Sequence, residues 1–148
     1  MEIQLGDVGH IIQLAIAPVF LLTGVGTNLT VLTNRLARII DRSRVLEDRL
    51  QARGEADPAV IKELNTLYRR AHLINRSITL ATSCALLVCL VIASLFVGDA
   101  LGLSIGQFIA ALFVLAMLAL IGSFVFLLRE IFVATRMLTL HYVAPVRK

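Results

Sequence analysis

The chain has 148 residues, of which 58% are hydrophobic and only 16% are charged. Soluble domains carry about 45–50% apolar and about 25% charged residues, so a water-soluble fold of this length could not bury so much apolar surface. The formal net charge of +4 would suggest nucleic-acid binding in a soluble protein, but no nucleic-acid motif accompanies the basic residues. The composition predicts an integral membrane protein.

The first predicted transmembrane helix is an apolar run from about residue 11 to 32. A helix needs about 20 apolar residues to cross the hydrocarbon core. This span is the most polar of the chain, and polar side chains in a span normally face protein or water. Its candidate stripe, which we interpret as a helix-packing surface with a pore lining as the alternative, consists of Gln13, Pro18, Phe20, Gly24, Thr27, Asn28 and Asn34.

A dense charged collar follows the first span directly. It contains Arg35, Arg38, Asp41, Arg42 and Arg44. Asp41 lies three residues from both Arg38 and Arg44, so it can pair with either on a helix surface. We favour a juxtamembrane collar that holds the helix against anionic lipid head groups. The alternative is a charged ring at the cytoplasmic mouth of an oligomer.

The segment 33–77 is predicted to form a cytoplasmic antiparallel helical hairpin, packed like a coiled coil. Gly54, Asp57 and Pro58 mark the turn, because glycine suits a helix end and proline the first helical position. Two apolar stripes recur at spacings of three and four and form the expected seam. The first is Leu32, Leu36, Ile39, Ser43, Leu46 and Leu50; the second is Ile61, Leu64, Tyr68, Ala71, Asn75 and Ile78.

The second arm of the hairpin carries an additional apolar stripe of Val60, Leu67 and Ile74. Two helices cannot cover both stripes, so another element must pack there. The candidates are a neighbouring subunit and a cytoplasmic tail helix at about 129–148, and we expect both to contribute. The tail would offer Ile131, Phe132, Leu138 and Tyr142. This surplus apolar surface predicts a homo-oligomer.

The second and third predicted spans run from about 78 to 97 and from about 105 to 128. Their serine, threonine and alanine residues are typical of helix packing in membranes. We find no buried carboxylate within the spans that could relay protons or cations, which weakens a secondary-transporter hypothesis. Cys84 and Cys89 lie five residues apart on one helix, so we expect no disulfide between them.

The basic residues predict the orientation. All 14 Lys and Arg lie between the first two spans or after the third. Lys and Arg resist translocation across the membrane. The amino terminus is therefore expected outside, and the carboxyl terminus in the cytoplasm.

Enzymatic activity is not expected. The sequence has no nucleophile elbow, no phosphate-binding glycine loop and no HExxH-type pair. His10, His72 and His141 lie in different segments, so they indicate no metal site. We predict no catalytic residue, no cofactor and no nucleic-acid partner.

Two motifs carry a family resemblance. One is Pro-x-Phe-Leu at Pro18–Leu21, and the other is Arg-Leu-Ala-Arg-x-x-Asp-Arg at Arg35–Arg42. With these motifs the chain resembles a family of small bacterial membrane proteins catalogued as domain of unknown function 2721. The resemblance covers most of the chain and implies a bacterial source and a location in the cytoplasmic (inner) membrane. It implies no activity, substrate or catalytic residue.

The sequence thus predicts one all-α membrane domain over residues 1–148. The favoured function is a homo-oligomeric, non-enzymatic membrane interaction or scaffold protein. Its candidate partners are anionic lipid head groups and a protein on the cytoplasmic hairpin. The alternative is an oligomeric ion channel or small-solute pathway with the first helix around the axis. In that alternative Thr27, Asn28 and Asn34 would line the path.

Overall fold

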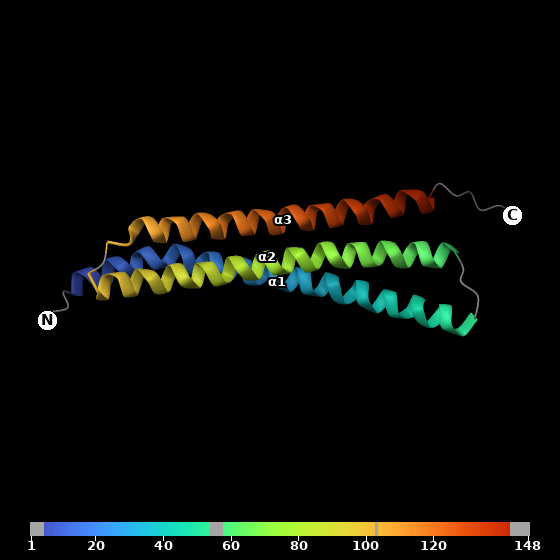
Figure 1. The fold of residues 1–148 in the computed structure, drawn as a ribbon, viewed down its shortest axis with the longest axis horizontal. Coiled ribbons are helices and arrows are strands. Elements are labelled where there is room, and N and C mark those ends of the chain that lie inside the picture. The colour runs from blue at the N-terminus through green and yellow to red at the C-terminus, as the bar shows by residue number, and fades with distance from the viewer. Residues whose placement is uncertain (1–4, 54–57, 103, 143–148) are drawn as a thin grey trace. The chain divides into compact units, whose positions relative to one another are not determined.

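Three α-helices form the fold in the computed structural model, which describes residues 5–53, 58–102 and 104–142. They are α1 (Leu5–Arg53), α2 (Pro58–Ala100) and α3 (Gly106–Tyr142) (Figure 1). The described residues contain no strand. The predicted all-α fold is confirmed.

Each helix is long and apolar enough to cross a membrane, over Gly9–Ala52, Pro58–Ala100 and Gly106–Thr135. The prediction of three membrane-spanning helices is confirmed at this level. None of the helices stops at the membrane edges predicted on the cytoplasmic side. α1 continues through Pro18, although the ring removes one backbone donor. The predicted tail helix is no separate element, because α3 runs on without a break to Tyr142.

The two connections differ in how much of them is described. Pro58 is the first residue of α2, as predicted, whereas Gly54 and Asp57 lie outside the described residues. α2 ends in a tight turn in which the Gly102 N–H donates to the Asp99 carbonyl at 3.0 Å. Gly102 has a φ of 63°, a left-handed conformation that glycine adopts without a steric penalty.

The chain divides into two compact units. One comprises Met1–Thr30 and Thr79–Gly122, and the other Val31–Ile78 and Ser123–Lys148. The second unit contains all 14 Lys and Arg residues, and the first contains none. We call them the apolar unit and the basic unit. Their division falls close to the predicted ends of the first two spans.

In the basic unit, the α1 side of the core follows the predicted stripe. Leu32, Ile39, Ser43 and Leu46 are buried, and Leu36 and Leu50 are half-buried. They recur at spacings of three and four, so they share one face of the helix.

The predicted α2 stripe is wrong in part, because Leu64, Ala71 and Ile78 are half-buried but Asn75 is exposed. Ile61 and Tyr68 of the expected seam are 40% and 48% exposed, whereas Leu67 and Ile74 of the supposed surplus stripe are 5% and 0% exposed. The physical reason is the third helix. Because α3 bonds to α2 at Ser77, the core of this unit is shared by three helices rather than two, and the buried face of α2 turns accordingly.

The tail segment of the same chain therefore packs in the basic unit. It is one of the two elements that were predicted to pack on the additional α2 stripe. Ile131 is half-buried, but Phe132 is 65% exposed. The side chains of Leu138 and Tyr142 lie outside the described ones. A covering second subunit stays a prediction.

Small residues share the core of the apolar unit with the buried valines Val25, Val88 and Val91. Ala81, Cys84 and Ala116 are fully buried. A Cβ built on Gly122 would meet Leu80 Cδ1 at 3.1 Å, so α3 approaches α2 closely there. Small side chains permit such close contact between membrane helices. Cys84 is buried and Cys89 exposed, and both are free thiols, as predicted.

Polar contacts join α1 to α2 at the surface of the basic unit. The Arg42 guanidinium donates to Glu63 Oε1 from Nε at 3.0 Å and from Nη2 at 2.8 Å. The Tyr68 hydroxyl donates to Glu47 Oε1 at 2.6 Å. Exposed ion pairs contribute little to stability. We therefore expect these surface contacts to add little to the free energy of unfolding.

Tyr68 is expected to ionise at a higher pH than free tyrosine. Its hydrogen bond to Glu47, and then the charge of that carboxylate, raise the pKa of Tyr68 above the ordinary 10.0. The contact stabilises the folded state below the ordinary pKa and is lost as the pH rises through the raised one. An ultraviolet titration of tyrosinate in the Tyr142→Phe variant isolates Tyr68, since the chain has two tyrosines. Glu47→Gln should lower the midpoint; an unchanged midpoint would contradict the assignment.

Candidate functional site

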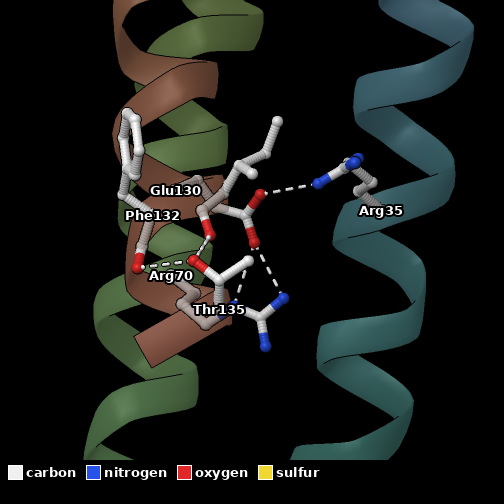
Figure 2. A network of polar contacts seen from close by, with 6 residues as sticks. Arg35, Arg70, Glu130, Phe132 and Thr135 are labelled. Carbon is white, nitrogen blue, oxygen red and sulfur yellow. Dashed lines mark hydrogen bonds and ion pairs between the residues drawn. The ribbon is translucent and has the colours of Figure 1, made fainter. Parts of the chain in front are cut away.

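A buried carboxylate lies where all three helices meet in the basic unit. The Glu130 side chain of α3 is 0% exposed. Its Oε2 accepts a hydrogen bond from Arg35 Nη1 of α1 at 2.9 Å. Its Oε1 accepts two from Arg70 of α2, from Nε at 2.9 Å and from Nη2 at 2.8 Å. Figure 2 shows the carboxylate between the two guanidinium groups. We call these three residues the Glu130 centre.

The sequence places Glu130 on the buried line of α3. Ala116, Ser123 and Glu130 follow one another at intervals of seven residues, and all three are 0% exposed. On α2, Ser77 lies seven residues after Arg70. Ser77 bonds to Ser123 and Arg70 to Glu130, so the two helices run antiparallel in the basic unit. The two polar levels are about 10 Å apart along the helices.

The Ser77–Ser123 pair is the second polar level and is fully buried. The Ser77 hydroxyl donates to the Ser123 carbonyl at 2.7 Å, and the Ser123 hydroxyl donates to the Ser77 carbonyl at 2.9 Å. The two hydroxyl oxygens are 2.9 Å apart. Each serine is thus satisfied by the other helix, as is usual for polar groups between packed membrane helices.

Replacing Ser77 with alanine is expected to lower the free energy of unfolding by roughly 0.5–1.5 kcal/mol, the range for hydrogen bonds between membrane helices. The loss is measured by denaturant titration in detergent, followed by circular dichroism. Ser83→Ala is the matched control, because the Ser83 hydroxyl donates to the Thr79 carbonyl of its own helix. Equal effects in the two variants would show that the contact between α2 and α3 contributes nothing.

Charge and burial are unequal within the Glu130 centre. The Arg70 and Arg35 side chains are 23% and 41% exposed, whereas the carboxylate they share is fully enclosed. One anion and two cations leave the centre with an excess positive charge. Both carboxylate oxygens are engaged by guanidinium groups, an arrangement in which a buried charge is compensated. The arrangement suits a structural clamp that joins three helices.

Glu130 was missed by the sequence analysis, which placed the end of the third span at about 128 and found no buried carboxylate within the spans. The residue lies two positions beyond that end. One signal could have found it: Glu130 is the only acidic residue after Asp99. Its interval of seven from Ser123 places it on the helix face that packs against α2.

The predicted charged collar does not form one cluster. Arg35 belongs to the Glu130 centre, and Arg42 pairs with Glu63 of α2. Arg38, Asp41 and Arg44 are exposed. Asp41 forms no ion pair with any described residue, so the predicted pairing with Arg38 or Arg44 is not found. Two of the four arginines thus pair with carboxylates of other helices.

The predicted polar stripe divides between two faces of α1. Pro18 is buried, and Asn28 is half-buried with an Nδ2 that has no hydrogen-bond partner among the described residues. The other members are exposed, namely Gln13, Phe20, Gly24, Thr27 and Asn34. No side chain lies within 4 Å of a Cβ built on Gly24. The exposed members therefore face outward from the single chain.

Comparison with known proteins gives one family. Residues 15–140 match the family model described as Protein of unknown function (DUF2721). The match includes all three residues of the Glu130 centre. No curated protein and no solved structure matches the chain significantly.

Proposed function

The chain belongs to the DUF2721 family of proteins of unknown function, and we propose that it is a homo-oligomeric, non-enzymatic membrane interaction or scaffold protein. Its apolar unit crosses the bacterial cytoplasmic membrane with the amino terminus outside. Its basic unit lies in the cytoplasm, where α1 and α2 form an antiparallel helical hairpin packed like a coiled coil.

Charge distribution supports this topology. All Lys and Arg lie in the basic unit, and such residues stay on the cytoplasmic side of the membrane. The Arg42–Glu63 and Tyr68–Glu47 contacts support the hairpin. Each of them joins a residue of α1, before the connection, to a residue of α2, after it.

The observation that carries the proposal is the exposed polar line on α1. Gln13, Phe20 and Thr27 lie seven residues apart on one face, and all three are exposed. Lipid does not solvate the Gln13 amide, and polar groups in a span normally face protein or water. The Thr27 hydroxyl donates to the Thr23 carbonyl of its own helix at 3.1 Å, so Gln13 carries this argument. No heavy atom of the structure lies within 4 Å of a Cβ built on Gly24 of the same helix. Glycine allows a second helix to approach closely. A second copy of the chain supplies such a helix.

The Glu130 centre supports a structural rather than a catalytic role. A general base needs a carboxylate oxygen within reach of its substrate. Here Arg35 occupies one oxygen and Arg70 the other, and the carboxylate is fully buried. The centre joins helices and leaves the exposed faces of the chain for interactions.

The test is the mass of the protein in detergent, measured by light scattering. Wild type is expected as a defined oligomer, and Gly24→Leu as a smaller species with unchanged helix content. Val114→Leu is the matched control, because Val114 is exposed on α3 and faces lipid in this proposal. A monomeric wild type would refute self-association.

A channel or small-solute pathway is the second candidate, and the same polar line favours it. If several α1 helices surround an axis, Thr27 and Asn34 line the path. Thr27→Val removes a hydroxyl at nearly constant volume, so it should change flux through reconstituted vesicles without changing the mass of the oligomer. Vesicles without flux under any ion gradient would exclude this candidate.

A further inference from the structure

A groove of about 440 Å³ lies between α2 and α3 in the basic unit. Arg69 of α2 and Arg129 of α3 line it, together with the apolar side chains of Leu73, Phe132 and Val133. The groove therefore combines two cations from different helices with an apolar floor. The Phe132 ring points away from the carboxylate of Glu130 (Figure 2), so the groove is separate from the Glu130 centre.

The two arginines of the groove have no acidic partner among the residues that the structure describes. Both are exposed, and neither forms an ion pair or hydrogen bond with a described residue. Their neighbours in the chain, Arg70 and Glu130, pair with each other. That pair fixes α2 against α3 and so holds Arg69 and Arg129 at the same groove. Two like charges repel each other there, and an anion bound between them would relieve the repulsion.

The groove residues of α3 lie just beyond the predicted end of the third span. Arg129 follows the predicted end of the third span by one residue. Phe132 is 65% exposed in the next turn, and aromatic rings are common at the head-group level. Arginines near the ends of spans extend their guanidinium groups toward the same level.

We propose that this groove binds one anionic phospholipid of the leaflet that contacts the basic unit. Arg69 and Arg129 hold the head-group phosphate by charge-assisted hydrogen bonds. Leu73, Phe132 and Val133 pack against the glycerol region and the upper acyl chain. The proposal rests on the membrane location of the chain and not on its subunit number.

The test is native mass spectrometry of the full chain in detergent with added phosphatidylglycerol or, separately, phosphatidylcholine. Wild type is expected to retain one tightly bound phosphatidylglycerol per subunit. Arg69→Gln and Arg129→Gln should each weaken retention about fivefold, the effect of one basic residue near an anionic surface, and the double variant more than tenfold. Arg44→Gln is the matched control, since Arg44 is exposed on α1 and forms no ion pair with a described residue. Retention of the lipid by this variant should change less than about twofold.

Four outcomes would overturn the proposal. An equal loss in Arg44→Gln would indicate a diffuse basic surface, and equal retention of phosphatidylcholine would remove the role of charge. Displacement of the lipid by inorganic phosphate would assign the groove to a free anion. Loss of a subunit in the double variant would assign the groove to a second copy. A monomer that still retains phosphatidylglycerol would refute the oligomer and support the lipid site, so the two proposals fail separately.

Discussion

Replacing Glu130 with alanine is expected to lower the free energy of unfolding by about 2–4 kcal/mol, somewhat below the usual loss for one partner of a buried ion pair. The variant leaves two guanidinium groups facing each other without the carboxylate between them. Solvent reduces the effect, because Arg35 and Arg70 are 41% and 23% exposed. Denaturant titration in detergent, followed by circular dichroism, measures the loss.

Two controls sharpen this result. Glu63→Ala breaks an exposed pair with Arg42 and should lower the stability by no more than about 1 kcal/mol. The double variant Arg70→Met with Glu130→Met replaces charges by apolar groups of similar length and should recover much of the loss, since a buried pair is often replaceable as a unit. A Glu130→Ala protein no less stable than Glu63→Ala would contradict the structural role of the centre.

Ile74→Ala is expected to lower the free energy of unfolding by about 2–4 kcal/mol, the range for large-to-small substitutions in a packed core. Ile74 is 0% exposed in the basic unit. The resulting cavity would lie where α2 packs against its neighbours.

Ile61→Ala is the matched control for this substitution. Both residues are isoleucines of α2 in the basic unit, but Ile61 is 40% exposed. Its replacement should lower the stability by less than about 1 kcal/mol, because little apolar area is lost. A larger loss of stability at Ile61 than at Ile74 would indicate that the predicted seam containing Ile61 is the buried face of α2. It would contradict the packing of three helices.

The membrane-spanning helices were predictable because their signal is local and strong. Backbone groups in lipid must bond within the helix, so a long apolar run has few alternatives to a helix. The α1 stripe of Leu32, Ile39 and Leu46 was predictable for a similar reason, since one spacing pattern marks one face. On α2 either of two neighbouring apolar stripes could form the buried face. The sequence alone does not say which of them α3 covers.

The Glu130 centre could not be derived in the same way. Its partners are 60 and 95 residues away in the chain, and ten basic residues precede the second span as possible partners. A hydropathy average hides one carboxylate among apolar neighbours. The lone acid after Asp99 marks Glu130 as unusual, but only the packing of three helices selects Arg35 and Arg70.

The antiparallel contact between α2 and α3 has a consequence for the choice among alternative alignments. Buried residues repeat every seven positions, so an apolar contact surface would fit almost equally well after a slide of two helical turns. Such a slide would separate Ser123 from Ser77 and leave Glu130 buried without Arg70. These two polar pairs therefore distinguish one alignment from its near-equivalents. With leucine at both Ser123 and Glu130, the helices would still associate, but as a mixture of displaced alignments.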